Sequence, residues 1–357
     1  MYSRRIKKFQ QFMKKENLDG FVINRMVNIR YLCGFSGDTG LLVILTGQAF
    51  LLCDSRFYTM ARKEVKGARV YLTKSLPLNE LKDMDRFQIK NYRFGYESDY
   101  LSCSQLKTLQ ENLPAALLVP MTDSVEFLSI IKDKGEIELI QAAVDIADTA
   151  FDRILGYLKP GQRELEVAAE LEYQMKMMGS NKPAFDTIVA SGFRSAMPHG
   201  VASDKKIRKG DFVTFDFGAE YKGYVSDMTR TVIMGKATAR QKKIYNLVLR
   251  AQRAGIKKVK PGVECRAVDT AARKVIDRAG FKKNFGHGTG HGIGIYVHVK
   301  PNVGPRSTDT LKKGMIITVE PGVYIPEWGG VRIEDDVLVT GRGGKVMNQA
   351  PKKLLEL

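Results

Sequence analysis

A repeat with a spacing near 100 residues dominates the second half of this chain. The tripeptide Lys159-Pro160-Gly161 returns as Lys260-Pro261-Gly262, 101 residues later. Each copy follows one stretch with helical periodicity and precedes another, which ends at Gly179 in the first copy and at Gly280 in the second. Pro and Gly in these places are typical of helix ends. The period is too long for a solenoid and predicts two duplicated α+β halves that share one site.

The first third of the chain has a different pattern, in which strand-like and helix-like runs alternate. We expect strands at 20–24, 41–45, 49–54, 93–96 and 117–120, and helices at 57–66 and 104–113. This alternation predicts an α/β domain. A break near 121–124 precedes a long amphipathic helix expected at 135–158. For 357 residues two domains are typical, and we expect them at 1–124 and 125–357.

All four histidines of the chain lie in the second domain, in loops that are rich in Gly or flanked by Pro. Between them, acidic residues recur on expected strands, at offsets that follow the repeat. In chain order the set reads His199, Asp216, Asp227, His287, His291, His298, Glu320 and Glu334. Histidines interleaved with spaced carboxylates indicate a metal enzyme.

Two expected hairpins arrange these carboxylates in pairs. Asp216 and Asp227 are equidistant from the centre of a hairpin at 212–217 and 224–232, whose turn lies around 221–223. If they face each other, their Cβ atoms lie roughly 5 Å apart. Glu320 and Glu334 repeat the arrangement around a turn at 326–330. Like charges at that distance destabilise a sheet unless a cation lies between them.

Four converging carboxylates and one imidazole, for which we choose His291, are too rich in oxygen for a structural zinc site. They suit two divalent ions about 3.5–4 Å apart, with Mn²⁺ or Co²⁺ first and Zn²⁺ or Fe²⁺ next. The alternative is that acidic residues are surface strand residues or partners for the many Lys and Arg side chains, and this is our interpretation of Asp335 and Asp336.

Other catalytic patterns are not supported. The Gly-rich segment 286–294 has no strict G-x-G-x-x-G and no Walker lysine, and we expect its glycines to let the backbone approach His291 and the ions. Ser191 and Ser195 lie near His199, but no G-x-S-x-G elbow exists. His287 is expected to be structural, and Trp328 to pack against a turn.

The net charge of +18 raises the question of a nucleic-acid partner. No nucleic-acid-binding motif accompanies it, and we expect a solvated basic surface instead. The four cysteines form no C-x-x-C pair, and no apolar run reaches the length of a membrane span, which together predict a cytoplasmic protein without a membrane partner.

The motifs resemble those of the pita-bread metallopeptidases, which include aminopeptidase P, prolidase and methionine aminopeptidase. The resemblance covers essentially the whole chain. The stretch 191–200, with Met197-Pro198-His199-Gly200, is similar to the proline-specific branch, as are 31–37 and 54–57 in the first domain. It implies an α+β fold, with a C-terminal pita-bread domain of duplicated halves and antiparallel sheet behind an N-terminal α/β domain of the creatinase type.

The resemblance also implies roles for the residues. The metal ligands are Asp216, Asp227, His291, Glu320 and Glu334, with Asp227 and Glu334 bridging the ions. A water or hydroxide between the ions is the nucleophile, and Glu320 shuttles its proton. His298 contacts the tetrahedral intermediate, and His199 positions the scissile carbonyl or the residue after it. Arg332 holds a carboxylate ligand or the carboxylate of the substrate.

One segment departs from the family pattern. The family usually has His-Glu-x-Pro, whereas this chain has His298-Val299-Lys300-Pro301. None of the changed residues is an expected ligand, so the departure concerns rate and substrate preference.

Within that family, the Gly-Phe-Ser-Gly and Asp-Ser-Arg segments at 34–37 and 54–56 most resemble the short bacterial aminopeptidase P type. The function that we expect is therefore an Xaa-Pro aminopeptidase acting on peptides with proline at the second position. The alternative is an Xaa-Pro dipeptidase, or prolidase. A non-catalytic binding protein on the same fold, or a metal-free creatine hydrolase, is disfavoured by the complete ligand set. The resemblance further implies a homodimer.

Overall fold

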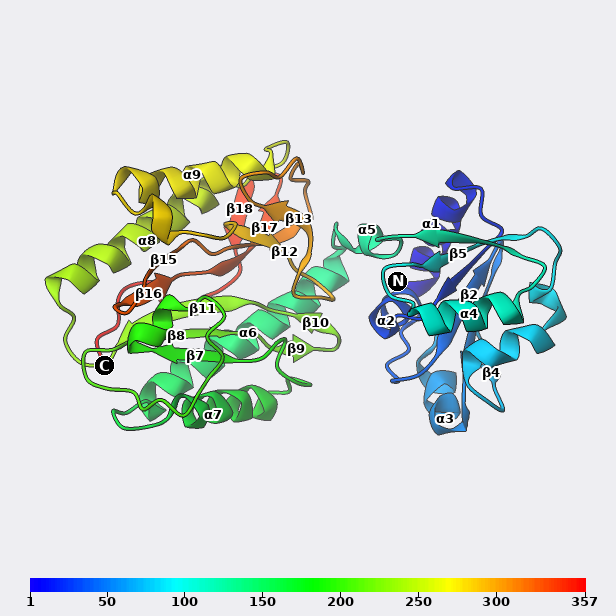
Figure 1. Ribbon diagram of the computed structural model, residues 1–357, viewed down its shortest axis with the longest axis horizontal. Helices are drawn as coiled ribbons and strands as arrows, with labels where there is room; N and C mark the ends of the chain where they lie inside the picture. Colours follow the sequence, from blue (N-terminus) through cyan, green and yellow to red (C-terminus); the bar gives the residue numbers. More distant parts are fainter. The chain divides into compact units, whose positions relative to one another are not determined.

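A six-stranded sheet organises the first of the two units into which the chain divides, Met1–Ser129 and Ile130–Leu357 (Figure 1). The computed structural model describes all 357 residues. Helix α5 (Glu126–Ser129) belongs to the first unit, where Glu126 bonds Arg25 and Asn28. The proposed domain boundary after Ser124 remains a prediction.

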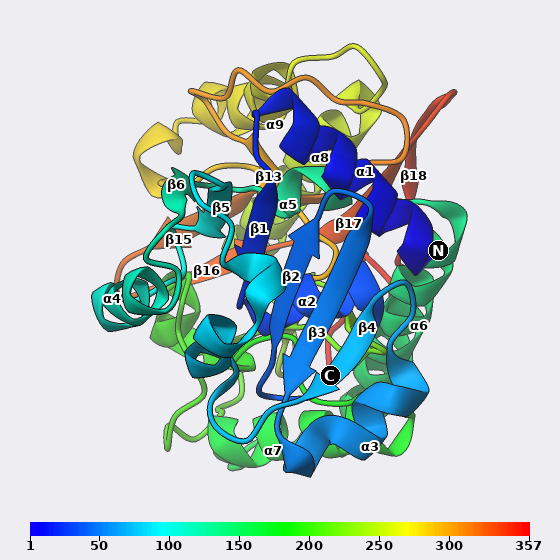
Figure 2. The ribbon, with the colours of Figure 1, turned by 90° about the vertical axis from the view of Figure 1, so that its right-hand side faces the viewer.

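The sheet of the first unit is mixed. Its strands lie in the order β4-β3-β2-β1-β5-β6, and Figure 2 shows β1 to β4 side by side. The bounds are β1 Gly20–Ile23, β2 Leu41–Leu45, β3 Gln48–Cys53, β4 Arg69–Leu72, β5 Arg93–Glu97 and β6 Leu117–Met121. The β1–β2 and β2–β3 pairs are antiparallel and the others are parallel. The α/β pattern predicted for this part of the chain is thereby confirmed.

The helices of the first unit, apart from α5, are 8 to 14 residues long. They are α1 Tyr2–Lys15, α2 Met26–Cys33, α3 Ser55–Glu64 and α4 Cys103–Asn112, with 3₁₀ turns at Pro77–Asp83 and Asp85–Phe87. The apolar positions of α1 recur at helical spacing, and Ile6, Phe9 and Met13 are all buried. None of the helices in the chain combines the length and the apolar character needed to cross a membrane.

The second unit contains the predicted duplication. Helices α6 (Lys134–Tyr157) and α7 (Glu164–Met177) form one pair, and α8 (Ala239–Lys258) and α9 (Cys265–Arg278) form the other. In Figure 1 the sheets of this unit lie between the two helix pairs. Gly161 and Gly262 have φ values of 93° and 80°, in the left-handed region that glycine adopts without strain. The repeated tripeptide therefore makes the same tight turn between the helices of each pair.

Each half also supplies strands to the middle layer. The first half has a sheet in the order β11-β8-β7, and the second half has one in the order β13-β12-β14-β17-β18. Two short hairpins, β9–β10 and β15–β16, complete the layer. The bounds are β7 Ile188–Ser191, β8 Phe212–Phe217, β9 Glu220–Tyr221, β10 Tyr224–Val225, β11 Met228–Ile233, β12 Gly290–Gly292, β13 Val299–Val303, β14 Ile316–Val319, β15 Gly322–Ile325, β16 Gly329–Arg332, β17 Asp335–Thr340 and β18 Gly343–Val346, with 3₁₀ turns at Gly192–Ala196 and Lys282–Asn284.

The register of one predicted hairpin is as expected and that of the other is not. Gly322 pairs with Arg332 and Ile325 with Gly329, which is the register that sets Glu320 opposite Glu334. In the first hairpin, however, Asp216 pairs with Thr229 rather than with Asp227.

The reason for the shift is the turn of the first hairpin. Tyr221 pairs with Tyr224, so the two turn residues are Lys222 and Gly223, with φ values of 48° and 83°. Two consecutive positive φ values define the tight turn that suits a twisted hairpin. Because the register moves by two residues, Asp227 stays on the same face as Asp216 but is its diagonal neighbour.

Candidate metal centre

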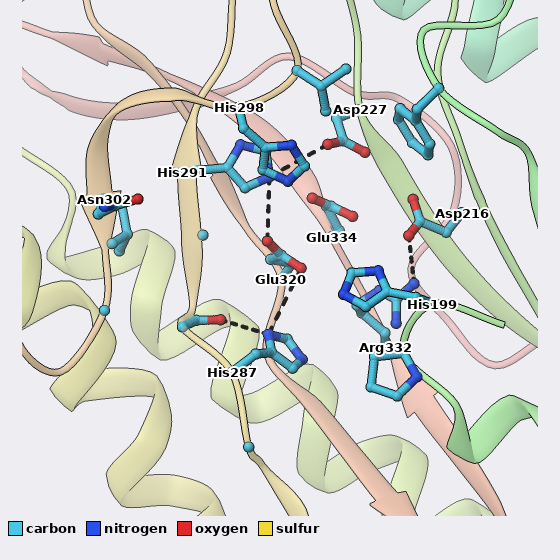
Figure 3. Close-up of a pocket in the computed structure, with 18 of the residues that line it drawn as sticks. His199, Asp216, Asp227, His287, His291, His298, Asn302, Glu320, Arg332 and Glu334 are labelled. Atoms are coloured by element: carbon cyan, nitrogen blue, oxygen red, sulfur yellow. Dashed lines mark hydrogen bonds and ion pairs between the residues drawn. The ribbon is translucent and has the colours of Figure 1, made fainter. Parts of the chain in front are cut away.

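The five predicted ligands lie at the ends of strands from both halves and line one cavity of about 790 Å³ (Figure 3). Asp216 is on β8 and His291 on β12. Asp227 directly precedes β11, whereas Glu320 follows β14 and Glu334 follows β16. The duplicated halves therefore bring together side chains that are up to 118 residues apart in sequence.

Three of the five form a close cluster. A ligand atom from each of Asp227, His291 and Glu334 lies within 4.8 Å of the other two, and all three residues are buried. Glu320 joins them, since its Oε1 is 3.5 Å from Nε2 of His291. This arrangement of carboxylate and imidazole donors could hold a divalent metal ion.

The ring of His291 is oriented for coordination. Its Nδ1 lies 3.1 Å from the carbonyl oxygen of Gly292, and a carbonyl only accepts hydrogen bonds, so the proton is on Nδ1. Nε2 then presents a lone pair toward Oδ2 of Asp227 at 3.6 Å and Oε1 of Glu320 at 3.5 Å. Burial lowers the pKa of His291 to about 4, so the ring is neutral at pH 7. A neutral nitrogen facing two carboxylates fits a cation between them.

The electrostatics of the carboxylates lead to the same conclusion. Burial, followed by repulsion from Glu334, raises the pKa of Asp227 well above its usual range. Burial and repulsion from Glu320 do the same for Glu334, and burial raises the pKa of Glu320 to about 8. Each shift means that the anion is unfavourable without a compensating positive charge. The buried Oδ1 of Asp216 and Oε1 of Glu334 have no hydrogen-bond partner, and both are free for a metal ion.

Arg332 faces the cluster as its buried counter-charge. Its guanidinium donates to Oδ2 of Asp216 at 2.5 Å, to Oγ1 of Thr229 at 2.9 Å and to the hydroxyl of Tyr324 at 2.9 Å. Of the two roles expected for Arg332, the structure shows the first, a contact with the carboxylate of the predicted ligand Asp216. Thr229 in turn donates to Oε2 of Glu334 at 2.6 Å. The hydroxyl of Thr229 thereby links Arg332 to Glu334, a second predicted ligand.

Thr229 and Tyr324 were not predicted from the sequence. The available signal is the strand period of two, because Thr229 follows Asp227 and Tyr324 follows Glu320 at even spacing on their strands. That period places them on the ligand face once the strands are known.

The remaining histidines lie around the same cavity. His199 and His298 are exposed, and the ring of His298 lies 4.2 Å from that of His291. His287 bonds the carbonyl oxygen of Gly288 at 2.7 Å and the Tyr324 hydroxyl at 2.8 Å. Both of its ring nitrogens are therefore engaged, in keeping with the structural role expected for it, although it also lines the cavity.

The expectation for Asp335 and Asp336 was only partly right, since both are fully buried rather than at the surface. Asp335 does pair with Arg230 and Lys352. Burial opposes its ionisation, but these two cations hold the pKa of Asp335 below its usual range. Asp336 instead accepts from the backbone N–H of Asp227 at 3.0 Å, so it helps to hold a predicted ligand in place.

The glycines around His291 and the single tryptophan, Trp328, have packing roles. A Cβ on Gly290 would lie 2.1 Å from the carbonyl oxygen of Thr318, and one on Gly292 would lie 2.4 Å from that of Lys300. These glycines therefore let β12 fit between β13 and β14, rather than serving the ions directly. Trp328 packs on Phe212 with ring centroids 5.5 Å apart, as expected for turn packing.

Comparison with known proteins agrees with this geometry. Residues 138–341 match the model of Metallopeptidase family M24, and residues 5–128 match the Creatinase/Prolidase N-terminal domain. A relative named Xaa-Pro dipeptidase, from Pyrococcus horikoshii, is 39% identical over 99% of this chain and 99% of its own.

Solved structures give the same result over the full length. An Xaa-Pro dipeptidase from Bacillus anthracis superposes with a TM-score of 0.96 at 40% identity, covering 100% of both chains. An X-Pro aminopeptidase from Thermotoga maritima has a TM-score of 0.89 at 34% identity, covering 95% of this chain and 97% of that one. The predicted pair of domains, and the fold of each, is thereby confirmed.

Proposed function

The chain belongs to metallopeptidase family M24, and from that premise we propose that it hydrolyses the bond between an N-terminal residue and proline with two divalent metal ions. The ligands that we propose are Asp216, Asp227, His291, Glu320 and Glu334. One observation carries this proposal, namely the neutral Nε2 of His291 directed at the carboxylates of Asp227 and Glu320. When bound, such ions polarise a carbonyl and acidify water.

The other residues of the cavity would bind and orient the peptide. Glu320 reaches the centre of the cluster, and we propose it as the group that carries a proton from water to the leaving amine. The exposed rings of His199 and His298 line the cavity, where they would donate to the carbonyl at the scissile bond. Arg332 would fix the orientation of Asp216 rather than meet the substrate, because it is buried and its contacts go to the protein.

Dipeptides are the substrate class that the relatives favour. The two Xaa-Pro dipeptidases are more similar in sequence to this chain than the Thermotoga X-Pro aminopeptidase is. The motifs at 31–37 and 54–57 led instead to the expectation of an aminopeptidase, and the likeness to the Thermotoga enzyme keeps that activity as the second candidate. Both candidates share the scissile bond and differ in whether proline is the last residue.

Three finer points belong to the same proposal. Manganese suits the oxygen-rich ligand set best, followed by cobalt, zinc or iron. The four cysteines are free thiols, in keeping with a reducing cytoplasm. The homodimer implied by the family resemblance is retained.

The test compares Ala-Pro with Ala-Pro-Ala as substrates. Metal-stripped protein should be inactive and should regain activity with Mn²⁺. Asp227→Asn should lower kcat/KM by about a thousand-fold or more, because a lost ligand forfeits several kcal/mol of stabilisation. The dipeptidase is supported if Ala-Pro is cleaved and Ala-Pro-Ala is not, and the opposite preference supports the aminopeptidase.

Asp152→Asn is the matched control, since Asp152 is an exposed acid on α6, outside the cavity. It should retain wild-type kcat/KM and the same metal requirement. Absence of cleavage of either peptide with every divalent ion would contradict the proposed function.

A further inference from the structure

A single buried carboxylate closes the loop that carries His199. The loop runs from Ser191, at the end of β7, to Ser203, and it contains the 3₁₀ turn Gly192–Ala196. Glu164, the first residue of α7, is fully buried beside both ends of this loop. It accepts five hydrogen bonds, and all five come from loop residues.

The two carboxylate oxygens of Glu164 bond opposite ends of the loop. Oε1 accepts from the backbone N–H of Ser191 at 2.7 Å and from its hydroxyl at 2.8 Å. Oε2 accepts from the hydroxyl of Ser203 at 2.6 Å and from its backbone N–H at 3.2 Å. One carboxylate thus ties the first and last residues of the loop together.

The fifth hydrogen bond, from Arg194, connects Glu164 to the part of the loop next to His199. Nε of Arg194 donates to Oε2 of Glu164 at 2.9 Å, and Nη2 of Arg194 donates to the carbonyl oxygen of Val201 at 2.6 Å. Val201 is two residues from His199, and its own N–H bonds the carbonyl oxygen of His199 at 2.9 Å. A chain of hydrogen bonds therefore runs from Glu164 through Arg194 to the backbone of His199.

The other side of the loop is attached to the second half of the duplication. The hydroxyl of Ser195 accepts from the N–H of Gly330 at 2.8 Å and donates to the carbonyl oxygen of Gly192 at 2.6 Å. Gly330 lies on β16, the strand that ends with Arg332. The loop therefore has a fixed neighbour on the side of the metal ligands, and Glu164 holds it from the opposite side.

We propose that Glu164 is a positioning residue for His199, acting through Arg194 and the two ends of the loop. The ring of His199 is exposed and lines the cavity, so its own contacts do not fix its place. Its position then depends on the loop backbone, which Glu164 restrains. A carboxylate is required because the donors converge on both oxygens, and an amide would turn an NH₂ group toward one set of them.

This proposal rests on the proposed function only where it is tested by peptide cleavage. Glu164→Gln should lower kcat/KM for the cleaved Xaa-Pro peptide about ten- to hundred-fold, since small displacements of a positioning group cost that much. The same substitution in a His199→Ala background should change kcat/KM less than about two-fold, because the group that Glu164 positions is already gone. Losses that instead multiply across the two backgrounds would overturn the proposal.

Glu166→Gln is the matched control, because Glu166 lies in the same turn of α7 and bonds only Arg163 at 2.9 and 3.0 Å. It should leave kcat/KM unchanged in both backgrounds. Arg194→Gln provides a second variant if Glu164→Gln does not fold, and it should show a smaller loss with the same dependence on His199.

Hydrogen exchange supplies a readout that needs no activity. Glu164→Gln should speed exchange of the amides of Met197, Gly200 and Val201, which bond within the loop, and leave those of β14 unchanged. Unchanged exchange in the loop would overturn the proposal whether or not a peptide is cleaved. An inactive wild-type protein with faster loop exchange in the variant would count against the proposed function alone.

Discussion

Three buried carboxylates outside the candidate metal centre have specific sets of partners. Glu164 has five donors, and Asp335 has two cations. Glu97, in the first unit, accepts from the backbone N–H groups of Asn24 and Arg25 at 2.9 Å and from the amide of Asn28 at 2.6 Å. These neutral donors do not fully offset burial, which raises the pKa of Glu97 to about 7.

The raised pKa of Glu97 makes stability depend on pH. The folded chain binds this proton more tightly than the unfolded chain. The protonated carboxyl of Glu97 therefore stabilises the fold fully below about pH 4.5, and this stabilisation is lost as pH rises through 7. Between pH 5 and 8, the free energy of unfolding of the wild type should fall more than that of Glu97→Gln, by on the order of 3 kcal/mol. Denaturant titrations followed by circular dichroism measure both. Exposed Glu111→Gln serves as control, and an equal fall in Glu97→Gln and wild type would contradict the assignment.

At the scale of elements, the hairpin of β8 to β11 depends on a close approach of two backbones. A Cβ on Gly218 would lie 1.8 Å from the carbonyl oxygen of Ser226, closer than any real contact. Gly218 and Ser226 lie just beyond Asp216 and just before Asp227. The distance between these two proposed ligands therefore depends on the absence of a side chain at position 218.

Gly218→Ala should consequently weaken both folding and metal binding. The overpacked hairpin should lose about 1–3 kcal/mol of unfolding free energy, since the strands must separate to accept the methyl group. Mn²⁺ affinity measured by calorimetry should fall with it. Gly156→Ala, on α6 with nothing within 4 Å, should keep the affinity and stabilise the chain by about 0.5–1 kcal/mol. Equal effects of the two substitutions would argue against the close approach.

On the scale of the whole molecule, most of the net positive charge comes from one stretch of the sequence. Residues 236–283, which include α8 and α9, hold 15 Lys and Arg but 3 Asp and Glu, and so supply 12 of the 18 net charges. Two-fold dimers bring the same surface of both chains together, so an interface on this basic surface would set like charges opposite each other. We therefore expect the proposed dimer to use another surface.

The loop around His199 is the candidate surface. Its Phe193, Met197 and Val201 are 51%, 47% and 48% exposed, which is unusual for three large apolar side chains so close in sequence. Sedimentation at micromolar concentration should give twice the mass of one chain. Phe193→Glu with Met197→Glu should shift it toward the monomer, and Lys243→Glu with Arg250→Glu should not. A wild-type monomer would reject the dimer.

The sequence alone predicted the fold class, the duplication, and the four histidines and four acidic residues that line the cavity. These follow from local rules, since strand and helix periods, Pro-Gly helix ends and the spacing of acids about a turn are all written along the chain. The register of the second hairpin was predictable for this reason. That of the first was not, because Lys222 adopts a positive φ that its residue type does not announce.

Only the tertiary structure decided which partners these residues have. Three contacts join residues that are far apart in sequence. Asp336 bonds the backbone of Asp227, and Arg332 is linked through Thr229 to Glu334. Glu164 bonds the loop that carries His199. The first two contacts depend on how the two halves pack against each other, and the third depends on how α7 packs beside β7 within the first half. Because packing is a property of the folded molecule, periodicity along the chain supplies candidates for a site, and the assembled sheets determine which of them meet.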